Sequence, residues 1–205
     1  MTYSYLTLKE PAEGIYKEKG SKFLAFAYPV ADEEEVKAIV GRLRKEYHDA
    51  RHHCFAWVLG PEKARFRAFD DGEPAHSAGD PILGQLKHRD LTDVLLVVVR
   101  YFGGVKLGVG NLAAAYKEAA RNALENAPIV EREVREDYVL EFPYLSTSEV
   151  MKLVKAFDLE ILEQSFHENC RMKVSVGMKD RDAFLKKISL LQALKMAVRL
   201  EGGDL

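Results

Sequence analysis

The sequence has no apolar run long enough to cross a membrane. Its longest uninterrupted one, Val94–Val99, has the length of a buried strand, whereas a membrane-spanning helix needs about 18 to 20 apolar residues. Residues 1–16 also lack the cationic segment and following apolar segment that mark a secretion signal. We therefore expect a cytoplasmic protein that is not attached to a membrane.

Cysteine is scarce. The two cysteines, Cys54 and Cys170, are far apart and show no CxxC spacing, so we expect no disulfide framework. No group of cysteines and histidines reaches the four closely spaced ligands of a structural zinc site. The sequence therefore predicts no metal site and gives no sign of a bound cofactor.

An excess of positive charge is also missing. Lysine and arginine number 30 against 32 aspartates and glutamates, which gives a net charge of −2. Non-specific binding to duplex nucleic acid depends on a large positive excess, so this balance argues against that class of function. A local basic patch remains compatible with this overall charge balance.

Apolar side chains are plentiful, because 47% of the 205 residues are hydrophobic, enough for one large domain or two small ones. Residues 94–100 are continuous and β-branched, which predicts a central strand buried on both faces. Asp80, before a proline, is expected to cap one helix, and Asn111 the next. The sequence predicts other strands at 3–8, 22–30, 53–59 and 65–69, and helices at 32–47, 80–87 and 112–125.

A charged, mixed segment at 129–138 separates two patterns. We place the boundary near Glu133, which gives domains at 1–133 and 134–205. After the boundary the pattern is strand, helix, strand, strand, helix and a last strand at 195–200. This βαββαβ order is that of the ferredoxin-like split βαβ fold. The chain is therefore expected to be of the α+β class.

Three polar segments of the first domain could carry chemistry. In the first, residues 50–56, His52, His53 and Cys54 follow one another. A strand would turn His52 and Cys54 to one face and His53 to the other. The group suggests a metal site or a cysteine–histidine nucleophile. The alternative is a small buried cysteine beside a hydrogen-bonding histidine.

The second segment is the acidic turn, residues 69–74. Its three carboxylates could bind a hard cation or act as acid and base, and the ordinary alternative is a solvated loop. Because a capped helix follows at once, many polar groups are concentrated here. The candidate catalytic residues of this turn and of the first segment are His52, Asp70, Asp71 and Glu73.

The third segment is the glycine-rich loop, residues 103–110, between a strand and a helix. Free N–H groups at a helix N-terminus bind anions, and Arg100 and Lys106 add positive charge. The glycines have the alternative role of allowing tight packing. The residue pattern alone leaves both roles open.

Taken together and in this order, these segments resemble the YigZ/IMPACT family. The similarity covers about residues 14–126, and the tail from about 137 resembles the smaller C-terminal domain of the bacterial branch. His53 stands where asparagine is usual, and His76 where a small residue is usual. The segments that carry the resemblance are Lys19-Gly20-Ser21-Lys22-Phe23, His52-His53-Cys54, Asp70-Asp71-Gly72-Glu73-Pro74, Ala78-Gly79, Pro81-Ile82-Leu83, Val98-Val99-Arg100-Tyr101-Phe102-Gly103-Gly104, Leu107-Gly108 and Gly110.

The resemblance implies a first domain like domain IV of elongation factor G, a fold also found in a small-subunit ribosomal protein and in small-molecule kinases. It implies a second domain like domain V of the same factor, in the same order. The eukaryotic relative modulates translation by competing for an activator of the starvation-responsive initiation-factor kinase. The bacterial members have no settled biochemical activity.

Two functions therefore compete. The first is a translation-associated regulatory or binding protein that contacts RNA, the ribosome or a translation factor, and the lack of a complete catalytic set favours it over an enzyme. The second is an enzyme acting on a phosphorylated small molecule or nucleotide, in a cleft formed by the acidic turn and the glycine-rich loop with His52 close by. The expected binding residues are Lys19, Lys22, Arg100, Tyr101, Phe102, Gly103, Gly104, Lys106, Gly108 and Gly110. We expect the four cations among them to lie on one face.

Overall fold

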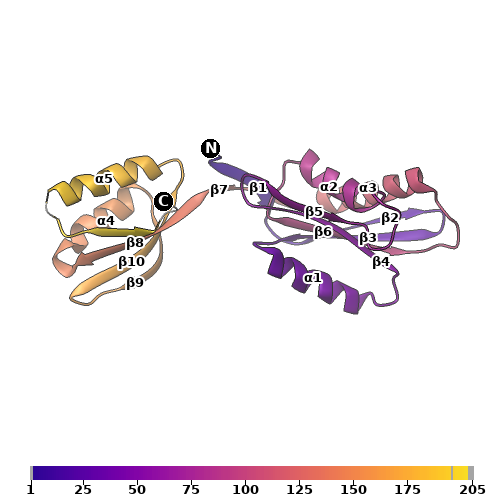
Figure 1. Ribbon diagram of the computed structural model, residues 1–205, viewed down its shortest axis with the longest axis horizontal. Helices are drawn as coiled ribbons and strands as arrows, with labels where there is room; N and C mark the ends of the chain where they lie inside the picture. Colours follow the sequence, from indigo (N-terminus) through magenta and orange to yellow (C-terminus); the bar gives the residue numbers. More distant parts are fainter. Residues whose placement is uncertain (1, 195, 203–205) are drawn as a thin grey trace. The chain divides into compact units, whose positions relative to one another are not determined.

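The computed structural model describes residues 2–194 and 196–202, which form two compact units (Figure 1). One unit is Tyr5–Arg132, and the other begins at Glu133 and includes the residues before Tyr5. The division thus falls within the charged segment 129–138. The sequence placed the residues before Tyr5 in the first domain, whereas the structure groups them with the second unit. One contact that joins them to it is the hydrogen bond from the Val134 N–H to the carbonyl oxygen of Tyr3 (2.8 Å).

The first unit combines short strands with three helices. Two of the strands, β2 (Ala12–Glu18) and β7 (Ile129–Glu133), were not predicted from the sequence. The apolar residues of β2 do not alternate, and β7 is mostly exposed, so neither shows the periodic apolar stripe that predicts a strand. Its elements are β1 (Ser4–Leu8), β2 (Ala12–Glu18), β3 (Ser21–Pro29), α1 (Glu33–Glu46), β4 (His52–Leu59), β5 (Arg65–Phe69), α2 (Gly79–His88), β6 (Val94–Tyr101), α3 (Val109–Glu125) and β7 (Ile129–Glu133).

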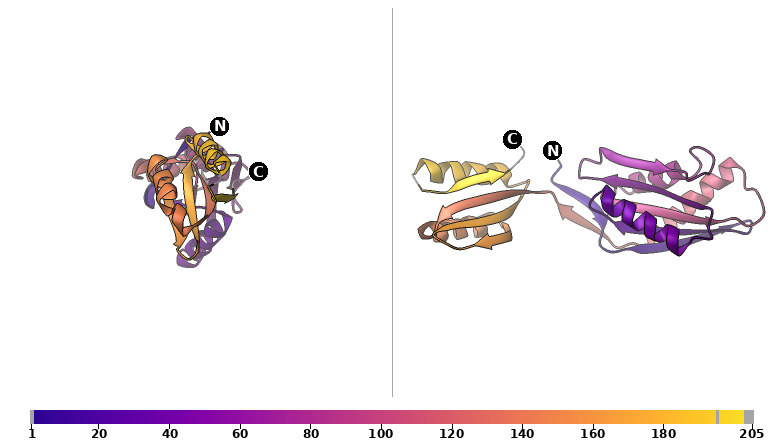
Figure 2. Two further views of the ribbon diagram at one scale, coloured as in Figure 1. Left: turned by 90° about the vertical axis from the view of Figure 1, so that its left-hand side faces the viewer. Right: turned by 60° about the horizontal axis from the view of Figure 1, so that its bottom comes forward.

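Five of these strands form an antiparallel sheet in the order β2-β3-β6-β4-β5. β6 is central, and its residues 94–100 are all buried. The unbroken apolar run 94–99 predicts this burial, and Arg100 is buried as well. Helices α2 and α3 cover one face of the sheet, and α1 covers the other (Figure 2). β1 and β7 pair separately as a two-stranded sheet.

Successive side chains of each strand point alternately into two hydrophobic cores, one on each face of the sheet. Phe23, Cys54 and Val98 lie in the core under α2 and α3, whereas Phe55 and Val97 contribute to the core under α1. Directly paired residues of antiparallel strands share one face of a sheet. The strand register therefore decides which side chains meet at the site.

The second unit is a four-stranded antiparallel sheet, β11-β8-β10-β9, whose core is shared with two helices. Its elements are β8 (Arg135–Pro143), a 3₁₀ turn (Tyr144–Ser146), α4 (Thr147–Ala156), β9 (Glu160–Ser165), β10 (Asn169–Gly177), α5 (Arg181–Ala193) and β11 (Arg199–Gly202). Apart from the 3₁₀ turn, this is the βαββαβ order that the sequence predicts, and the α+β class is confirmed. The last strand begins later than expected, and Lys195 lies outside the described residues. None of the described helices is long and apolar enough to span a membrane.

Candidate functional site

Asp70 follows β5 and caps helix α2. Its Oδ1 accepts hydrogen bonds from the backbone N–H groups of Ala78 (2.9 Å) and Gly79 (2.8 Å), and its Oδ2 accepts one from His76 (2.9 Å). Asp80, the cap predicted from the sequence, instead lies inside the first turn of α2. That prediction was wrong because the capping carboxylate comes from an earlier turn, which local sequence signals do not reveal.

These donors also set the ionisation of Asp70. Burial raises the pKa of its carboxyl group, but the three backbone N–H groups outweigh burial, and the pKa lies below its usual value. The carboxylate is therefore held ionised as part of the helix cap. It is not poised to exchange a proton near neutral pH.

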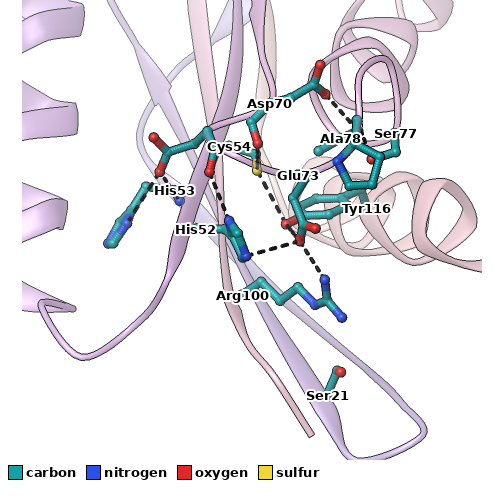
Figure 3. Close-up of polar contacts among 12 residues, drawn as sticks. Ser21, His52, His53, Cys54, Asp70, Glu73, Ser77, Ala78, Arg100 and Tyr116 are labelled. Carbon is teal, nitrogen blue, oxygen red and sulfur yellow. Dashed lines mark hydrogen bonds and ion pairs between the residues drawn. The ribbon is translucent and has the colours of Figure 1, made fainter. Parts of the chain in front are cut away.

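Asp71 joins the acidic turn to α1 and β4. Its carboxylate accepts hydrogen bonds from the His53 N–H (2.7 Å) and from Arg44 (2.6 Å). Its carbonyl oxygen accepts a hydrogen bond from Nδ1 of His52 (2.8 Å). Because a carbonyl can only accept, Nδ1 carries the proton, and the Nε2 of a neutral His52 has none to donate to Glu73, whose Oε1 is 4.0 Å away (Figure 3).

Glu73 is deeply buried, with 5% of its side chain exposed. Its Oε1 accepts hydrogen bonds from Arg100 (2.6 Å) and from the Tyr116 hydroxyl (2.8 Å) (Figure 3). The Arg100 side chain is 7% exposed, and its guanidinium lies 5.5 Å and 5.6 Å from the ring centroids of Phe23 and Phe102. The Arg100 charge is therefore balanced inside the protein.

Cys54 and Tyr116 complete this polar group. The Cys54 thiol lies 3.0 Å from the carbonyl oxygen of Asp70 and 3.3 Å from the Tyr116 hydroxyl. Burial raises the pKa of both Cys54 and Tyr116 well above their ordinary values. Since the thiolate is the reactive form of cysteine, the structure favours the buried structural role for Cys54 over the nucleophile.

Tyr116 is the residue of this group that sequence reasoning missed. It lies on the inner face of α3, in helical register with Leu112, Ala115 and Ala119. A buried tyrosine hydroxyl usually needs a hydrogen-bond partner. A tyrosine on an otherwise alanine-rich buried face was therefore the available signal that a polar group reaches this core.

The glycine-rich loop packs against the β2–β3 turn. A Cβ on Gly103 would overlap the backbone of Gly20, and the Gly103 N–H donates to the Ser21 hydroxyl (3.1 Å). Gly104 and Gly108 have φ angles of 86° and 77° with open space around them, so they bend the loop. Of the two roles left open for the glycines, tight packing applies to Gly103.

Helix α3 begins at Val109, earlier than the sequence predicts. Asn111 is consequently not its cap but lies within the first turn, where its side-chain amide donates to the carbonyl oxygen of Leu107 (2.9 Å). The glycine-rich loop thus runs directly into the helix, and Gly110 is part of the helix.

The acidic turn and the glycine-rich loop line one cavity of about 360 Å³, so the cleft expected between them is present. Phe102 just before the loop, Val105 within it and Val109 at the start of α3 are 49%, 52% and 59% exposed. Together with Lys106 at the cavity we call these residues the loop surface. The cavity is lined by Glu73, Pro74, Arg100, Phe102, Lys106, Leu107, Gly108, Val109 and Leu112.

The four predicted cations do not share one face. Arg100 pairs with Phe23, and because Phe23 belongs to the core under α2 and α3, Arg100 points to that side. Lys22 precedes Phe23 on β3, so its side chain points to the opposite side, that of α1. Lys19 lies in the β2–β3 turn and Lys106 in the glycine-rich loop, both exposed. The expected single basic face is wrong, because alternation turns neighbouring residues of β3 to opposite faces.

Tyr101 and His53 also face α1, away from the cavity. The Tyr101 hydroxyl donates to Asp49 (2.8 Å), and this contact raises the pKa of Tyr101 to about 12. Burial lowers the pKa of His53, and its Nε2 has no hydrogen-bond partner within the described residues. Neither side chain is placed to act on a ligand in the cavity.

Comparison with known proteins places this site within one family. A model of the Impact N-terminal domain matches residues 19–124, which include the acidic turn and the glycine-rich loop. The IMPACT family member YvyE of Bacillus subtilis is 33% identical over 184 residues, 90% of this chain and 85% of that one. The chain belongs to the IMPACT family.

The similarity to IMPACT family members extends beyond the first unit. YigZ of Escherichia coli, another member, is 33% identical over 188 residues, 91% of this chain and 92% of that one. A solved structure described as the crystal structure of a hypothetical protein matches 100% of this chain and 99% of its own, with a TM-score of 0.76 and 30% identity. The resemblance seen in the sequence motifs is confirmed.

Proposed function

We propose that this IMPACT family member is a translation-associated regulatory protein that binds a protein component of the translation apparatus through the loop surface. The observation that carries the proposal is the exposure of Phe102, Val105 and Val109 in one segment, residues 102–109, beside a cavity. Contiguous exposed apolar side chains on a soluble protein mark interaction sites. An apolar anchor entering a pocket is typical of the centre of a protein interface.

The hydrogen bonds of the site favour binding over catalysis. Asp70 caps α2, Asp71 holds the backbone of β4, and Glu73 neutralises Arg100. Cys54 and Tyr116 have pKa values raised by burial. Each of these groups is already held by a partner within the fold, whereas a catalytic acid or base must transfer a proton to or from a bound substrate.

The link to translation rests on the family resemblance. It implies domains like domains IV and V of elongation factor G in the same order, and the βαββαβ second unit is compatible with that proposal. A fold alone does not determine a function. The proposal therefore needs a direct test of the partner.

A protein partner is favoured over RNA by the charges at the cavity. Its two cations are Arg100 and Lys106, and Arg100 is neutralised by Glu73 at 2.6 Å. RNA affinity depends largely on unneutralised lysine and arginine. One exposed lysine among apolar side chains better matches the rim and centre of a protein interface.

Site-specific crosslinking tests this proposal. A photoreactive amino acid placed at position 105 should form adducts in cells, and mass spectrometry should identify a ribosomal protein or a translation factor. The matched control carries the same group at Leu190, which is also half-exposed but lies on α5. Adducts with RNA would reject the protein partner. Adducts only with proteins unrelated to translation, or the same adducts from both positions, would reject the proposal.

A second candidate is binding of a phosphorylated small molecule in the cavity. Its volume of about 360 Å³ is within the range of small-molecule pockets, about 300 to 1,000 Å³, and the N-terminus of α3 adjoins it. A chemical-shift titration with inorganic phosphate and a nucleoside monophosphate would decide this. Saturable shifts at residues 106–112 would favour the second candidate, and their absence would remove it.

A further inference from the structure

β5 is an edge strand of the five-stranded sheet. It pairs with β4 on one side, from Arg65 opposite Leu59 to Phe69 opposite Phe55. No other strand in the described part of the chain pairs with it on the other side. Its outward N–H and C=O groups therefore form a template on which an extended segment can pair.

A groove lies beside β5 on the face covered by α1. It has a volume of about 250 Å³ and an apolar floor that includes Phe55 and Trp57. Its charged lining includes Glu33 and Arg44, which are already paired with Arg65 and Asp71. The two remaining cations of the lining are Lys37 of α1 and Arg67 of β5. Both cations are exposed, and neither has an ion-pair partner in the residues that the structure describes.

The opposite face of β5 presents an exposed aromatic ring beside a cation. Phe66 is 50% exposed there, and the Lys87 ammonium group lies over its ring at 4.0 Å from the centroid. The edge therefore presents positive charge on the α1 face, and on the other face an aromatic side chain with Lys87 over it. A segment that pairs with it would place its own side chains alternately on these two faces.

We propose that β5 is the docking site for an extended acidic segment of a partner protein, which adds a sixth strand to the sheet. Backbone hydrogen bonds to the β5 edge provide the affinity, as in other strand-addition complexes. Acidic side chains at every second position face Arg67 and Lys37. The intervening apolar side chains pack on Phe66.

The charges of β5 argue against a second copy of this chain as the occupant. Pairing two β5 strands would bring Arg65 and Arg67 of one copy beside those of the other. Like charges on paired strands are destabilising, and charged side chains commonly protect edges from self-association. Arg65 has one counter-ion, Glu33 at 2.8 Å, whereas Arg67 has none in the described residues. An acidic strand removes this repulsion.

The probe is a fluorescein-labelled eight-residue peptide of alternating glutamate and valine, titrated against the full chain by fluorescence anisotropy. We expect saturable binding that weakens about tenfold or more in Arg67→Glu and in Lys37→Glu, equivalent to about 1.4 kcal/mol. Lys106→Glu, a matched exposed cation on the loop surface, should bind unchanged. Amide exchange should slow at residues 65–69, and circular dichroism should confirm that the variants are folded.

Two control peptides separate charge from strand pairing. A lysine–valine peptide should not bind, and a glutamate–valine peptide with alternate backbone nitrogens methylated should lose binding because it cannot pair. The proposal is overturned if no peptide binds, if the methylated peptide binds equally, or if Arg67→Glu leaves binding unchanged. Weakening by Lys106→Glu alone would place the peptide on the loop surface and also overturn it.

Discussion

Glu73 and Arg100 are the residues on which the cavity wall depends. Both are almost fully buried, and they are joined by a 2.6 Å contact that the Tyr116 hydroxyl shares. Removing one member of such a pair leaves the other charge buried without compensation. The pair is therefore expected to affect stability first and any binding second.

Replacing Glu73 by glutamine tests this. We expect Glu73→Gln to lower the free energy of unfolding by about 3 kcal/mol, because Arg100 loses its buried counter-ion. Glu118→Gln, which breaks an exposed ion pair with Arg121, should cost about 1 kcal/mol or less. Urea denaturation measures both changes, and equal losses would contradict the assigned role of Glu73.

The cap formed by Asp70 predicts a pH dependence. Asp70→Ala should lower the free energy of unfolding by about 1 to 2 kcal/mol at neutral pH, because helix α2 loses its capping carboxylate. The folded-state pKa of Asp70 lies below its unfolded value, so its contribution is complete above about pH 4 and is lost as the pH falls through the folded value.

Urea denaturation from pH 7 down to pH 3 measures this. The difference in stability between the wild type and Asp70→Ala should shrink below about pH 4. The control Asp182→Ala removes an exposed side chain and should change stability by less than about 0.5 kcal/mol. A difference between wild type and Asp70→Ala that stays constant to pH 3 would exclude the ionised cap.

The sequence predicted local features of the site but not its long-range contacts. Strand alternation correctly separated His52 and Cys54 from His53. It could not show that the Asp70 carboxylate reaches the N–H groups of α2, or that Glu73 neutralises Arg100. These contacts depend on how β4, β5 and β6 align, and register is a property of paired strands rather than of one segment.

At the scale of elements, the glycine-rich loop and the β2–β3 turn are held together by one glycine. Gly103 lies against Gly20 with no space for a side chain. Gly110, in the first turn of α3, has nothing near it. The two positions provide a matched pair with opposite expectations.

We expect Gly103→Ala to lower the free energy of unfolding by about 1 to 3 kcal/mol, because the added methyl group must displace the β2–β3 turn. Gly110→Ala should be neutral or stabilising by up to about 1 kcal/mol, since alanine favours a helix over glycine. Urea denaturation compares the two variants. Similar effects in both would contradict the close packing of Gly103.

Element prediction succeeded where one apolar period dominates. The unbroken apolar run of β6 and the inner face of α3 gave both elements correctly. β7 failed because its exposed, charged residues carry no buried stripe, and its strand conformation depends on pairing with β1. The start of α3 also failed, because glycine and valine at 108–110 read as loop in isolation.

At the scale of the whole molecule, the features proposed to be functional lie in the first unit. The loop surface and the β5 edge belong to residues 5–132, and the match to the Impact N-terminal domain falls in the same range. The second unit also exposes apolar side chains, at Tyr144, Leu145 and Phe166. They provide a control of similar chemistry for the central claim.

The most direct measurement uses the immobilised full chain in a reconstituted translation mixture, with retained components measured by quantitative mass spectrometry. The wild type should retain a protein of the translation apparatus, and the triple variant Phe102→Ser, Val105→Ser, Val109→Ser should retain at least about tenfold less, because apolar anchors at an interface each contribute about 1 kcal/mol or more. The triple variant Tyr144→Ser, Leu145→Ser, Phe166→Ser should retain as much as the wild type. Equal retention by the wild type and the loop-surface variant, or no retained component at all, would contradict the account.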